Sequence, residues 1–385
     1  MELNKTKLVK KRNLNAKTMR NNVLYMCPMT KIIPIIRPVG ELCNLKCAYC
    51  YYNSKNQTYC NDELIPNDIV EKFISQFLDI FNGEVTFLWH GGEPMLAGIE
   101  FYKRIIKIQE KYKKNHVIVN EIQTNGTLIN SEWATFFAEN DFHIGISLDG
   151  IKSCHNKFRA PNKESKIYDK VVNAIEHLRI HNIEPGILQT VTKSSMPHIR
   201  ENFYYFINDL KIKKWGVNVY NDYGNNNPLM ENESLDNEEY FKLYATLFDL
   251  WLQANDSSIE IREIKDFVSG VLGKYTGTCQ TSGICSAFIS VDNKGRITPS
   301  CDSYLGDLSS IEENIQTKNL IDILNGHNRI NFALKANTLP EKCKHCEWIK
   351  GCFNGCTFFR NKNNEYFYCE GRKRLFSYIR DIINQ

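Results

Sequence analysis

From about residue 31 to about residue 219, the chain alternates short apolar runs with longer amphipathic stretches. A short apolar run bounded by turn residues is typical of a buried strand, and apolar residues three and four positions apart are typical of a helix that covers a sheet. The predicted strands are KIIPIIRPV, EVTFLWH, VIVNEIQ, FHIGISLD, EPGILQTVT and KWGVNVY, and helices such as PNDIVEKFISQFLDIF lie between them. Six strand and helix pairs predict an α/β fold with a parallel sheet, either an open doubly wound sheet or a partial (β/α)6, TIM-like barrel.

The pattern changes after a further predicted helix at about 237–256. The segment AFISVDNKGRITPS predicts a β-hairpin that turns at Asp292–Gly295, where the glycine can adopt a positive φ. Short predicted helices and many cysteines follow, and this composition cannot build a large apolar core by itself. We therefore expect a basic N-terminal segment at 1–30, the α/β part at 31–260, and a small domain at 261–385 that is held together by metal clusters.

The composition argues against several classes of protein. The 385-residue chain is 42% apolar and 24% charged, which is ordinary for a soluble protein with a substantial core. Its 48 basic and 44 acidic residues give a net charge of +4, which is too balanced to predict a nucleic-acid partner. The first residues, MELNKTKLVKKRNLNAKTMR, lack the apolar stretch of a signal peptide, and no apolar run is long enough for a membrane span. We expect a cytoplasmic protein with neither a nucleic-acid nor a membrane partner.

The chain contains fourteen cysteines, and their number and spacing give the strongest indication of its chemistry. A reducing cytoplasm disfavours disulfides, so ligation of a metal or cluster is the predicted use. Most of these residues fall into three groups along the chain: Cys43, Cys47 and Cys50; then Cys279, Cys285 and Cys301; then Cys343, Cys346, Cys352, Cys356 and Cys369. The remaining Cys27, Cys60 and Cys154 have no assigned role, and we interpret them as free buried thiols that pack as small apolar side chains.

The first group lies in CNLKCAYC, directly after the first predicted strand, where α/β proteins place their active sites. Three thiolates from Cys43, Cys47 and Cys50 on a [4Fe–4S] cluster would leave one iron open for a non-protein ligand. A zinc knuckle is the alternative, and it needs a fourth ligand such as His90 or Cys60. The CxxxCxxC spacing after a strand that opens a βα series favours the cluster.

CNLKCAYC resembles the signature of the radical S-adenosylmethionine (SAM) superfamily. The resemblance implies a partial barrel, a cluster whose open iron binds SAM, and hydrogen abstraction by a 5′-deoxyadenosyl radical. The stretch Gly91-Gly92-Glu93-Pro94 follows the second predicted strand and resembles the GGEP motif of that superfamily. We expect Gly91 and Gly92 to let the backbone approach the ligand closely, and the resemblance implies that Glu93 accepts from the SAM ammonium group.

Further positions carry the same resemblance. Ser147 and Arg159 resemble residues that hold the SAM carboxylate and ribose in close relatives. Tyr49 resembles an aromatic residue that contacts adenine, and a plain packing role is an equally good interpretation. Gln123-Thr124-Asn125-Gly126 matches a TNG stretch that is common in this family, and we interpret it as structural support for the loop backbone.

The later cysteines number eight, which is enough for two complete four-cysteine sites. Two structural zinc sites would satisfy the same count. The pattern resembles the SPASM extension of radical SAM enzymes, a β-hairpin with short helices that holds two auxiliary [4Fe–4S] clusters. By that resemblance the first auxiliary cluster is bound by Cys279, Cys285, Cys301 and Cys356, and the second by Cys343, Cys346, Cys352 and Cys369. Full ligation by cysteine implies roles in electron transfer and folding stability.

Asp302 directly follows Cys301, so we expect a carboxylate beside the first auxiliary cluster. From about residue 30 the chain resembles the anaerobic sulfatase-maturating enzymes, in which an aspartate at this place is the proposed general base. Such a base would take the proton released when a substrate radical is oxidised. An aspartate that caps a turn is the equally weighted alternative.

The resemblance to sulfatase maturases departs at two places. Those enzymes typically carry Gln before the GGEP, where this chain has His90, and basic residues where this chain reads CFNGCTFFR. Peptide maturases with SPASM domains commonly show WHGGEP, as here. We therefore expect oxidative modification of a ribosomally made peptide, for example a carbon–carbon or thioether crosslink, with formylglycine formation in a sulfatase as the alternative.

The same resemblance implies partners. A flavodoxin or ferredoxin type of donor would supply electrons, and a separate leader-recognition protein could present the substrate, because only about thirty residues precede the barrel. The basic N-terminal segment could contact an acidic leader, although a solvated tail is the more ordinary interpretation. A binding protein with zinc-ribbon-like modules and no catalysis is the rival from another class.

Overall fold

The computed structural model describes residues 32–54, 63–160, 166–222, 227–274, 276–301 and 313–385. Within these residues one nine-stranded sheet runs in the order β7-β6-β5-β4-β3-β2-β1-β8-β9. Strands β1 to β7 are parallel, and each lies beside the next strand in the chain. The strands are β1 (Ile33–Ile36), β2 (Glu84–Trp89), β3 (Val117–Thr124), β4 (His143–Ser147), β5 (Gly186–Val191), β6 (Lys214–Val219), β7 (Glu260–Ile261), β8 (Phe288–Val291) and β9 (Ile297–Thr298).

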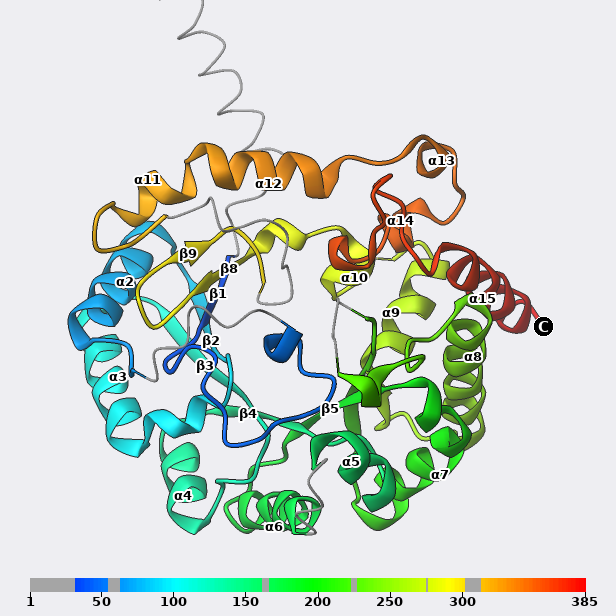
Figure 1. The fold of residues 1–385 in the computed structure, drawn as a ribbon, viewed down its shortest axis with the longest axis horizontal. Helices are drawn as coiled ribbons and strands as arrows, with labels where there is room; N and C mark the ends of the chain where they lie inside the picture. The colour runs from blue at the N-terminus through cyan, green and yellow to red at the C-terminus, as the bar shows by residue number, and fades with distance from the viewer. Residues whose placement is uncertain (1–31, 55–62, 161–165, 223–226, 275, 302–312) are drawn as a thin grey trace, which may run out of the picture.

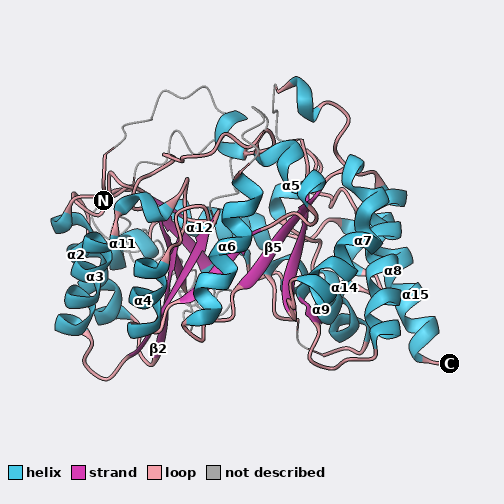
Figure 2. Ribbon diagram, turned by 90° about the horizontal axis from the view of Figure 1, so that it is seen from below, coloured by secondary structure: helices cyan, strands magenta, loops and turns pink. Residues whose placement is uncertain are grey.

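Helices surround the curved sheet on its outside, and the loops at the strand ends occupy the middle of the ring (Figure 1). Seen from the side, the strands slant between the helices as in a barrel wall (Figure 2). The first helices are α2 (Asn67–Ile80), α3 (Ile99–Tyr112), α4 (Ser131–Glu139), α5 (Lys152–Arg159), α6 (Ile167–Ile180), α7 (Ile199–Tyr204), α8 (Asn237–Ala254) and α9 (Arg262–Val271). This arrangement confirms the partial barrel and rules out the open doubly wound sheet.

Helices α2, α3, α4, α6, α7 and α8 form where the sequence pattern predicts them, whereas α5, α9 and strand β7 were not predicted. In α2 the buried side chains recur at three- and four-residue spacing, and they face the strands. Helix α8 begins at a capping box, in which the Asp236 side chain accepts from the Glu239 amide and the Glu239 side chain accepts from the Asp236 amide. It ends at Asn255, which adopts the left-handed conformation that commonly ends helices.

The predicted β-hairpin is confirmed. Strands β8 and β9 are antiparallel, and Gly295 in the turn between them has a φ of +75°. Strand β8 also pairs in parallel with β1, so the hairpin extends the barrel sheet. The sequence did not indicate this second pairing, because it depends on which segments the tertiary fold brings together.

The C-terminal region contains α11 (Leu320–Leu324), α12 (His327–Asn337), α13 (Glu341–Lys344), α14 (Ile349–Cys352) and α15 (Cys369–Ile383). Short helices were expected throughout, but α15 has 15 residues and packs against α8 and α9. Its buried residues Leu375, Phe376 and Ile379 join the same apolar core as the barrel strands. The division at residue 261 stays a prediction, since one core continues across it.

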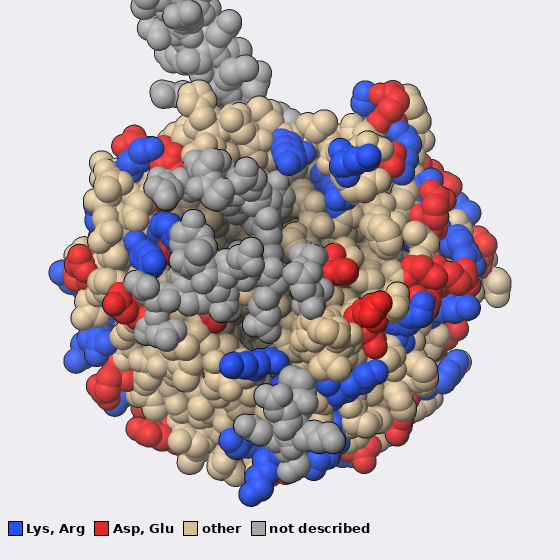
Figure 3. Space-filling view, in the orientation of Figure 1, with Lys and Arg blue, Asp and Glu red and all other residues tan. Residues whose placement is uncertain are grey.

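Basic and acidic side chains are interspersed over the face that Figure 3 shows. No helix among the described residues is long and apolar enough to cross a membrane.

Candidate active site and cysteine sets

The loop between β1 and the short helix η1 (Tyr51–Ser54) carries the first cysteine group. Cys43, Cys47 and Cys50 are all partly buried there, and the Cys50 amide donates to the Cys47 carbonyl at 3.1 Å. The Ala48 amide donates to the Phe158 carbonyl at 2.7 Å, which ties the loop to the end of α5. Three thiols on one short loop fit three corners of a [4Fe–4S] cluster and leave the fourth iron open.

Burial raises the pKa of these thiols, to about 11 for Cys43 and about 12 for Cys47. Each of the two also feels the charge of a neighbouring cysteine, so the thiolates would repel one another. The Arg159 guanidinium lowers the pKa of Cys47 in part. A cation is therefore needed to hold the three groups as thiolates at neutral pH, and iron binding would release their protons.

Glu93 is fully buried at the end of β2. Its Oε1 accepts from the Met95 amide at 3.0 Å and the Thr124 hydroxyl at 2.7 Å, and its Oε2 accepts from the Asn125 amide at 2.8 Å. Burial raises the pKa of this carboxyl, while the three hydrogen bonds lower it in part. The carboxylate is thus held in one orientation by the ends of two neighbouring strands.

The TNG stretch supports the cysteine loop, as its interpretation from sequence proposed. The Asn125 side chain donates to Asn44 Oδ1 at 2.8 Å and lies 3.8 Å from Cys43 Sγ. The Asn44 side chain donates in turn to Thr127 Oγ1 at 2.9 Å. These bonds join the end of β3 to the loop after β1, so the Glu93 carboxylate and the first cysteines share one rigid frame.

The two glycines before Glu93 pack against the loop that leaves β1. Gly91 has a φ of +111°, and a Cβ on Gly92 would lie 2.1 Å from the Leu42 carbonyl oxygen. The Gly92 and Glu93 amides donate to the carbonyls of Gly40 and Leu42, at 3.0 and 2.8 Å. The close approach that requires glycine is therefore to the protein's own backbone, and contact of Gly91 and Gly92 with SAM stays a prediction.

Ser147 and Arg159 lie at the ends of β4 and α5, on the rim of the barrel that also carries the cysteine loop and Glu93. The Gln123 side chain donates to Ser147 Oγ at 3.2 Å. Arg159 makes a two-point ion pair with Asp149, with Nε to Oδ2 at 2.8 Å and Nη2 to Oδ1 at 3.1 Å. Contact of Ser147 and Arg159 with SAM is not tested by this geometry.

Asp149 connects several residues of this rim through hydrogen bonds, and it was not predicted from the sequence. It is 3% exposed, and its carboxylate also accepts from the Tyr49 hydroxyl at 2.6 Å and the Thr190 amide at 3.0 Å. Burial alone would raise the pKa of this carboxyl, but the charge and hydrogen bonds of Arg159 outweigh it, and the pKa lies below its usual value. The only available signal was its place in the SLDG stretch, two residues after Ser147.

His155 lies beneath the ion pair and is fully buried. The Asp149 amide points to its Nδ1 at 3.4 Å, and its Nε2 has no hydrogen-bond partner among the described residues. Burial lowers its pKa to about 4. The imidazole is therefore neutral at physiological pH.

Tyr49 packs against neighbouring side chains and also donates its hydroxyl hydrogen bond to Asp149. Its ring lies 6.1 Å from that of Phe158, and the Arg159 guanidinium is 5.3 Å from its centre. These contacts support the packing interpretation, while contact with adenine stays a prediction.

The first set of four later cysteines comes together from four separate segments. Cys279 begins α10 (Cys279–Ser282), Cys285 begins a short 3-10 turn, Cys301 follows β9, and Cys356 precedes another 3-10 turn. After burial, the charges of Cys356, Cys301 and Cys285 are the largest causes that raise the pKa of the Cys279 thiol. Cys356 therefore lies near the other three thiols, and its assignment to this set stays a prediction.

The second set lines one small cavity that also includes the aromatic rings of Trp348, Tyr366 and Phe376; its cysteines are Cys343, Cys346, Cys352 and Cys369. After burial, the charges of the other three cysteines are the main causes that raise the pKa of Cys343 to about 11. No group of three or more Cys, His, Asp or Glu in the described ranges is spaced to hold a single metal ion. Ligation of two auxiliary clusters by these eight residues stays a prediction.

Arg372 lies between the two sets, and nothing in the sequence pattern singled it out. It is 1% exposed, and its Nη1 donates to the Gln280 carbonyl at 2.9 Å and lies 3.8 Å from Cys352 Sγ. Its Nη2 donates to the hydroxyls of Tyr240 and Tyr366, at 2.9 and 2.7 Å. A buried cation is therefore placed where two sets of thiolates would gather negative charge.

Some predicted residues lie outside the described residues, namely Asp302, Cys27 and Cys60. Cys154 is buried on α5, as predicted for a free thiol, and lies 3.9 Å from the Asn202 side-chain amide. His90, the possible zinc ligand, uses Nδ1 to accept from the Gly91 amide at 2.7 Å.

Comparison with known proteins identifies the family. The model of the radical SAM superfamily matches residues 38–204. A cysteine-type anaerobic sulfatase-maturating enzyme of Clostridium perfringens is 32% identical over 89% of this chain and 95% of its own length. A serine-type enzyme of Bacteroides thetaiotaomicron is 26% identical over 90% of this chain and 88% of its own length.

Solved structures agree with these matches. Native anSMEcpe with bound AdoMet and Kp18Cys peptide has a TM-score of 0.81 at 30% identity, covering 91% of this chain and 99% of its own. Streptococcus suis SuiB bound to the precursor peptide SuiA has a TM-score of 0.60 at 20% identity, covering 89% of this chain and 76% of its own, and shares the fold. The chain is therefore a radical SAM enzyme, a member of the radical SAM superfamily that is homologous over nearly its whole length to the anaerobic sulfatase-maturating enzymes.

Proposed function

We propose that this enzyme oxidises a cysteine side chain of a polypeptide substrate to formylglycine, the chemistry that the sequence analysis held as the alternative. The observation that carries the proposal is the 32% identity over 95% of a cysteine-type maturase, together with a TM-score of 0.81 to anSMEcpe bound to a Kp18Cys peptide. Cysteine is preferred to serine as the substrate residue because identity to the serine-type relative is lower, at 26%.

The residues of the rim have hydrogen-bonding capacity left for SAM. A carboxylate has about four acceptor sites, and Glu93 uses two on Oε1 and one on Oε2. The remaining site on Oε2 would accept from the SAM ammonium group. A guanidinium has five N–H donors, and Arg159 commits two of them to Asp149, so others remain for the SAM carboxylate.

Oxidation of cysteine to a thioaldehyde removes one hydrogen atom, one proton and one electron from the substrate. With SAM and the clusters bound, the adenosyl radical would take the hydrogen atom, and Asp302 is proposed to take the proton. When bound, the clusters supply one electron to SAM and accept the electron that the substrate loses. Water then replaces sulfur, which gives formylglycine and hydrogen sulfide.

Crosslinking of a ribosomally made peptide is the second candidate. His90 before the GGEP stretch favours it, since WHGGEP is common in peptide maturases. In this structure the His90 side chain accepts from the neighbouring Gly91 amide, a local role that is compatible with either reaction.

The proposal includes partners and location. An external donor of the flavodoxin or ferredoxin type would supply electrons, and a separate protein could present the substrate. A cytoplasmic location fits fourteen cysteines, because a reducing compartment keeps thiols available for iron.

An anaerobic assay tests the proposal. The cluster-loaded enzyme is incubated with SAM, a reductant and a sulfatase-derived peptide that contains cysteine, and with matched peptides that carry serine or alanine instead. We expect 5′-deoxyadenosine in all three reactions. The yield of aldehyde should be highest on the cysteine peptide. Asp302→Asn should still cleave SAM but lose the aldehyde. A crosslink without aldehyde would support the second candidate, and SAM cleavage without any peptide product would contradict both.

A further inference from the structure

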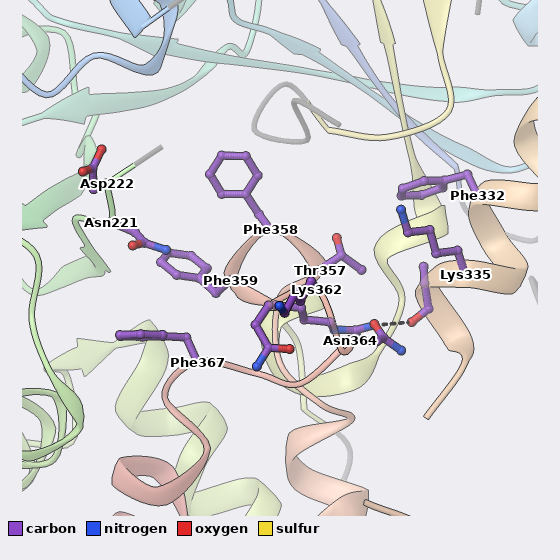
Figure 4. A pocket seen from close by; sticks show the side chains of 13 residues that line it. Asn221, Asp222, Phe332, Lys335, Thr357, Phe358, Phe359, Lys362, Asn364 and Phe367 are labelled. Atoms are coloured by element: carbon purple, nitrogen blue, oxygen red, sulfur yellow. Dashed lines mark hydrogen bonds between the residues drawn. The ribbon is translucent and has the colours of Figure 1, made fainter. Parts of the chain in front are cut away.

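A cavity of about 530 Å³ opens between three segments that are far apart in the sequence (Figure 4). One side is the loop after β6, with Asn221 and Asp222. The opposite side is α12, with Phe332 and Lys335, and the segment after Cys356 lies between them. Strand β6 is parallel to β1, so its loop lies on the same rim as the cysteine loop.

The cavity adjoins two of the three predicted cluster sites, the loop of Cys43, Cys47 and Cys50 and the set that includes Cys285. Tyr220, which precedes Asn221, packs with Ala48 of the cysteine loop, and Tyr49 covers the same small apolar cluster. On the other side Thr357 Oγ1 lies 3.3 Å from Cys285 Sγ. A polypeptide whose oxidised residue lies between these two places would therefore extend into the cavity.

The walls are aromatic. Phe332 is buried, Phe358 and Phe359 are half-buried, and Phe367 is 48% exposed although it lines the cavity. In Figure 4, Phe359 and Phe367 lie on the side of Asn221, and Phe332 lies across from them. Such a surface favours a bulky apolar side chain, because burial of the rings and of the ligand releases water from both.

The described lining of the cavity holds more basic than acidic side chains, since Asp222 is its one carboxylate, and the frame of the cavity is rigid. Lys335 and Lys362 are exposed, and neither forms an ion pair within the part of the chain that the structure describes. Arg360 plays a different role, since its guanidinium donates to the carbonyls of Asn354, Ala336 and Gly355 at 3.0, 2.9 and 3.1 Å. These bonds fasten the end of α12 to the cysteine-rich segment, which fixes the shape of the cavity.

We propose that this cavity binds the polypeptide substrate beside the oxidised residue and selects a bulky apolar side chain next to an acidic one. The inference rests on the proposed function, and it adds the sequence context in which the substrate cysteine is recognised. The aromatic walls receive the apolar side chain, and Lys335 and Lys362 attract the carboxylate.

The test uses fluorescein-labelled cysteine peptides in which a Phe-Glu pair is moved through a Gly/Ser background, one residue at a time, on either side of the cysteine. Binding to the cluster-loaded enzyme is measured by anisotropy without reductant. We expect one register to bind about tenfold more tightly than the Gly/Ser peptide, from burial of one large apolar side chain. Replacing Glu by Lys in that register should weaken binding about two- to fivefold, and added salt should reduce the difference.

Matched variants locate the effect. Phe367→Ala should remove most of the preference for Phe, while Leu334→Ala, at an exposed position on α12 outside the cavity, should leave it unchanged. The charge reversals Lys335→Glu and Lys362→Glu should remove the preference for Glu, and Lys350→Glu, which also lies outside the cavity, should not.

Each outcome decides one of the two proposals. If no register differs from the background, or if the control variants act as strongly as the cavity variants, the cavity is not the recognition site. Formylglycine on every cysteine peptide without any Phe-Glu preference would keep the proposed function and overturn this inference. Register-specific binding that depends on Phe367, without any aldehyde under turnover conditions, would support the cavity and overturn the proposed function.

Discussion

The buried ion pair between Asp149 and Arg159 gives the sharpest prediction about stability. Both side chains are nearly inaccessible, at 4% and 9% exposure, and the guanidinium donates twice to the carboxylate. The variant Asp149→Asn keeps one oxygen that can accept from the Thr190 amide or the Tyr49 hydroxyl. It removes the charge that faces Arg159 and turns an NH₂ group toward the guanidinium.

The magnitude follows from burial. Two unit charges about 4 Å apart interact by about 4 kcal/mol at an effective dielectric constant of about 20. Removing one partner of a buried pair typically costs about 3–5 kcal/mol, because the other charge stays buried without compensation. We therefore expect Asp149→Asn to lower the free energy of unfolding by about 4 kcal/mol.

The assay is urea denaturation followed by far-UV circular dichroism, on anaerobic samples of equal iron content. Asp169→Asn is the matched control, because its carboxylate pairs with Lys152 at 2.8 Å while both side chains are 51% exposed. An exposed pair of this kind contributes about 0–1 kcal/mol. Arg159→Met in the Asp149→Asn background should recover part of the loss. A loss for Asp149→Asn as small as that for Asp169→Asn would refute the reasoning.

Three further predictions concern other buried groups. Glu93→Gln should weaken SAM binding about tenfold or more in equilibrium dialysis, with unchanged iron content, because a charge-assisted hydrogen bond to the ammonium is lost; unchanged affinity would exclude Glu93 as that acceptor. His155 has a folded-state pKa of about 4 against 6.5 for the free group, so its contribution to stability is present above pH 6.5 and is lost as the pH falls toward 4. Between pH 6.5 and 4, the free energy of unfolding of His155→Asn should fall less than that of the unmodified protein, when both are measured by denaturation at each pH. Equal losses would contradict the prediction. Arg372→Met should make a cluster of the second set harder to reduce, because a cation near Cys352 is lost, and a midpoint potential that does not move in an EPR titration would count against this role.

The first six strands of the barrel were predictable because each is a short run rich in apolar residues, and the helices between them because their apolar stripes face the sheet. The hairpin was predictable from its turn residues. The pairing of β8 with β1 was not, because parallel neighbours are chosen by the packing of the whole chain. The length of α15 was also missed, since its apolar residues are interrupted by Arg372 and Arg374, whose side chains bond to the Tyr240 hydroxyl and the Glu238 carboxylate far away in sequence.

Some residues of the candidate site were likewise predictable from the sequence, and others were not. Spacing and position after a strand singled out Cys43, Cys47 and Cys50, and a count of eight cysteines pointed to two further sets. Arg372 carries no local signal and Asp149 only its place in the SLDG stretch, because their roles come from partners that lie between about ten and 130 residues away.

The most direct test of the account is the number and kind of metal ions per chain after anaerobic purification. Three [4Fe–4S] clusters predict about twelve irons, and Cys43→Ala, Cys279→Ala and Cys343→Ala should each lose about four. Addition of SAM should change the EPR spectrum of the reduced enzyme and of the Cys279→Ala and Cys343→Ala variants, but not that of Cys43→Ala. Zinc without iron, or an EPR spectrum that is indifferent to SAM in the fully loaded enzyme, would contradict the central claim.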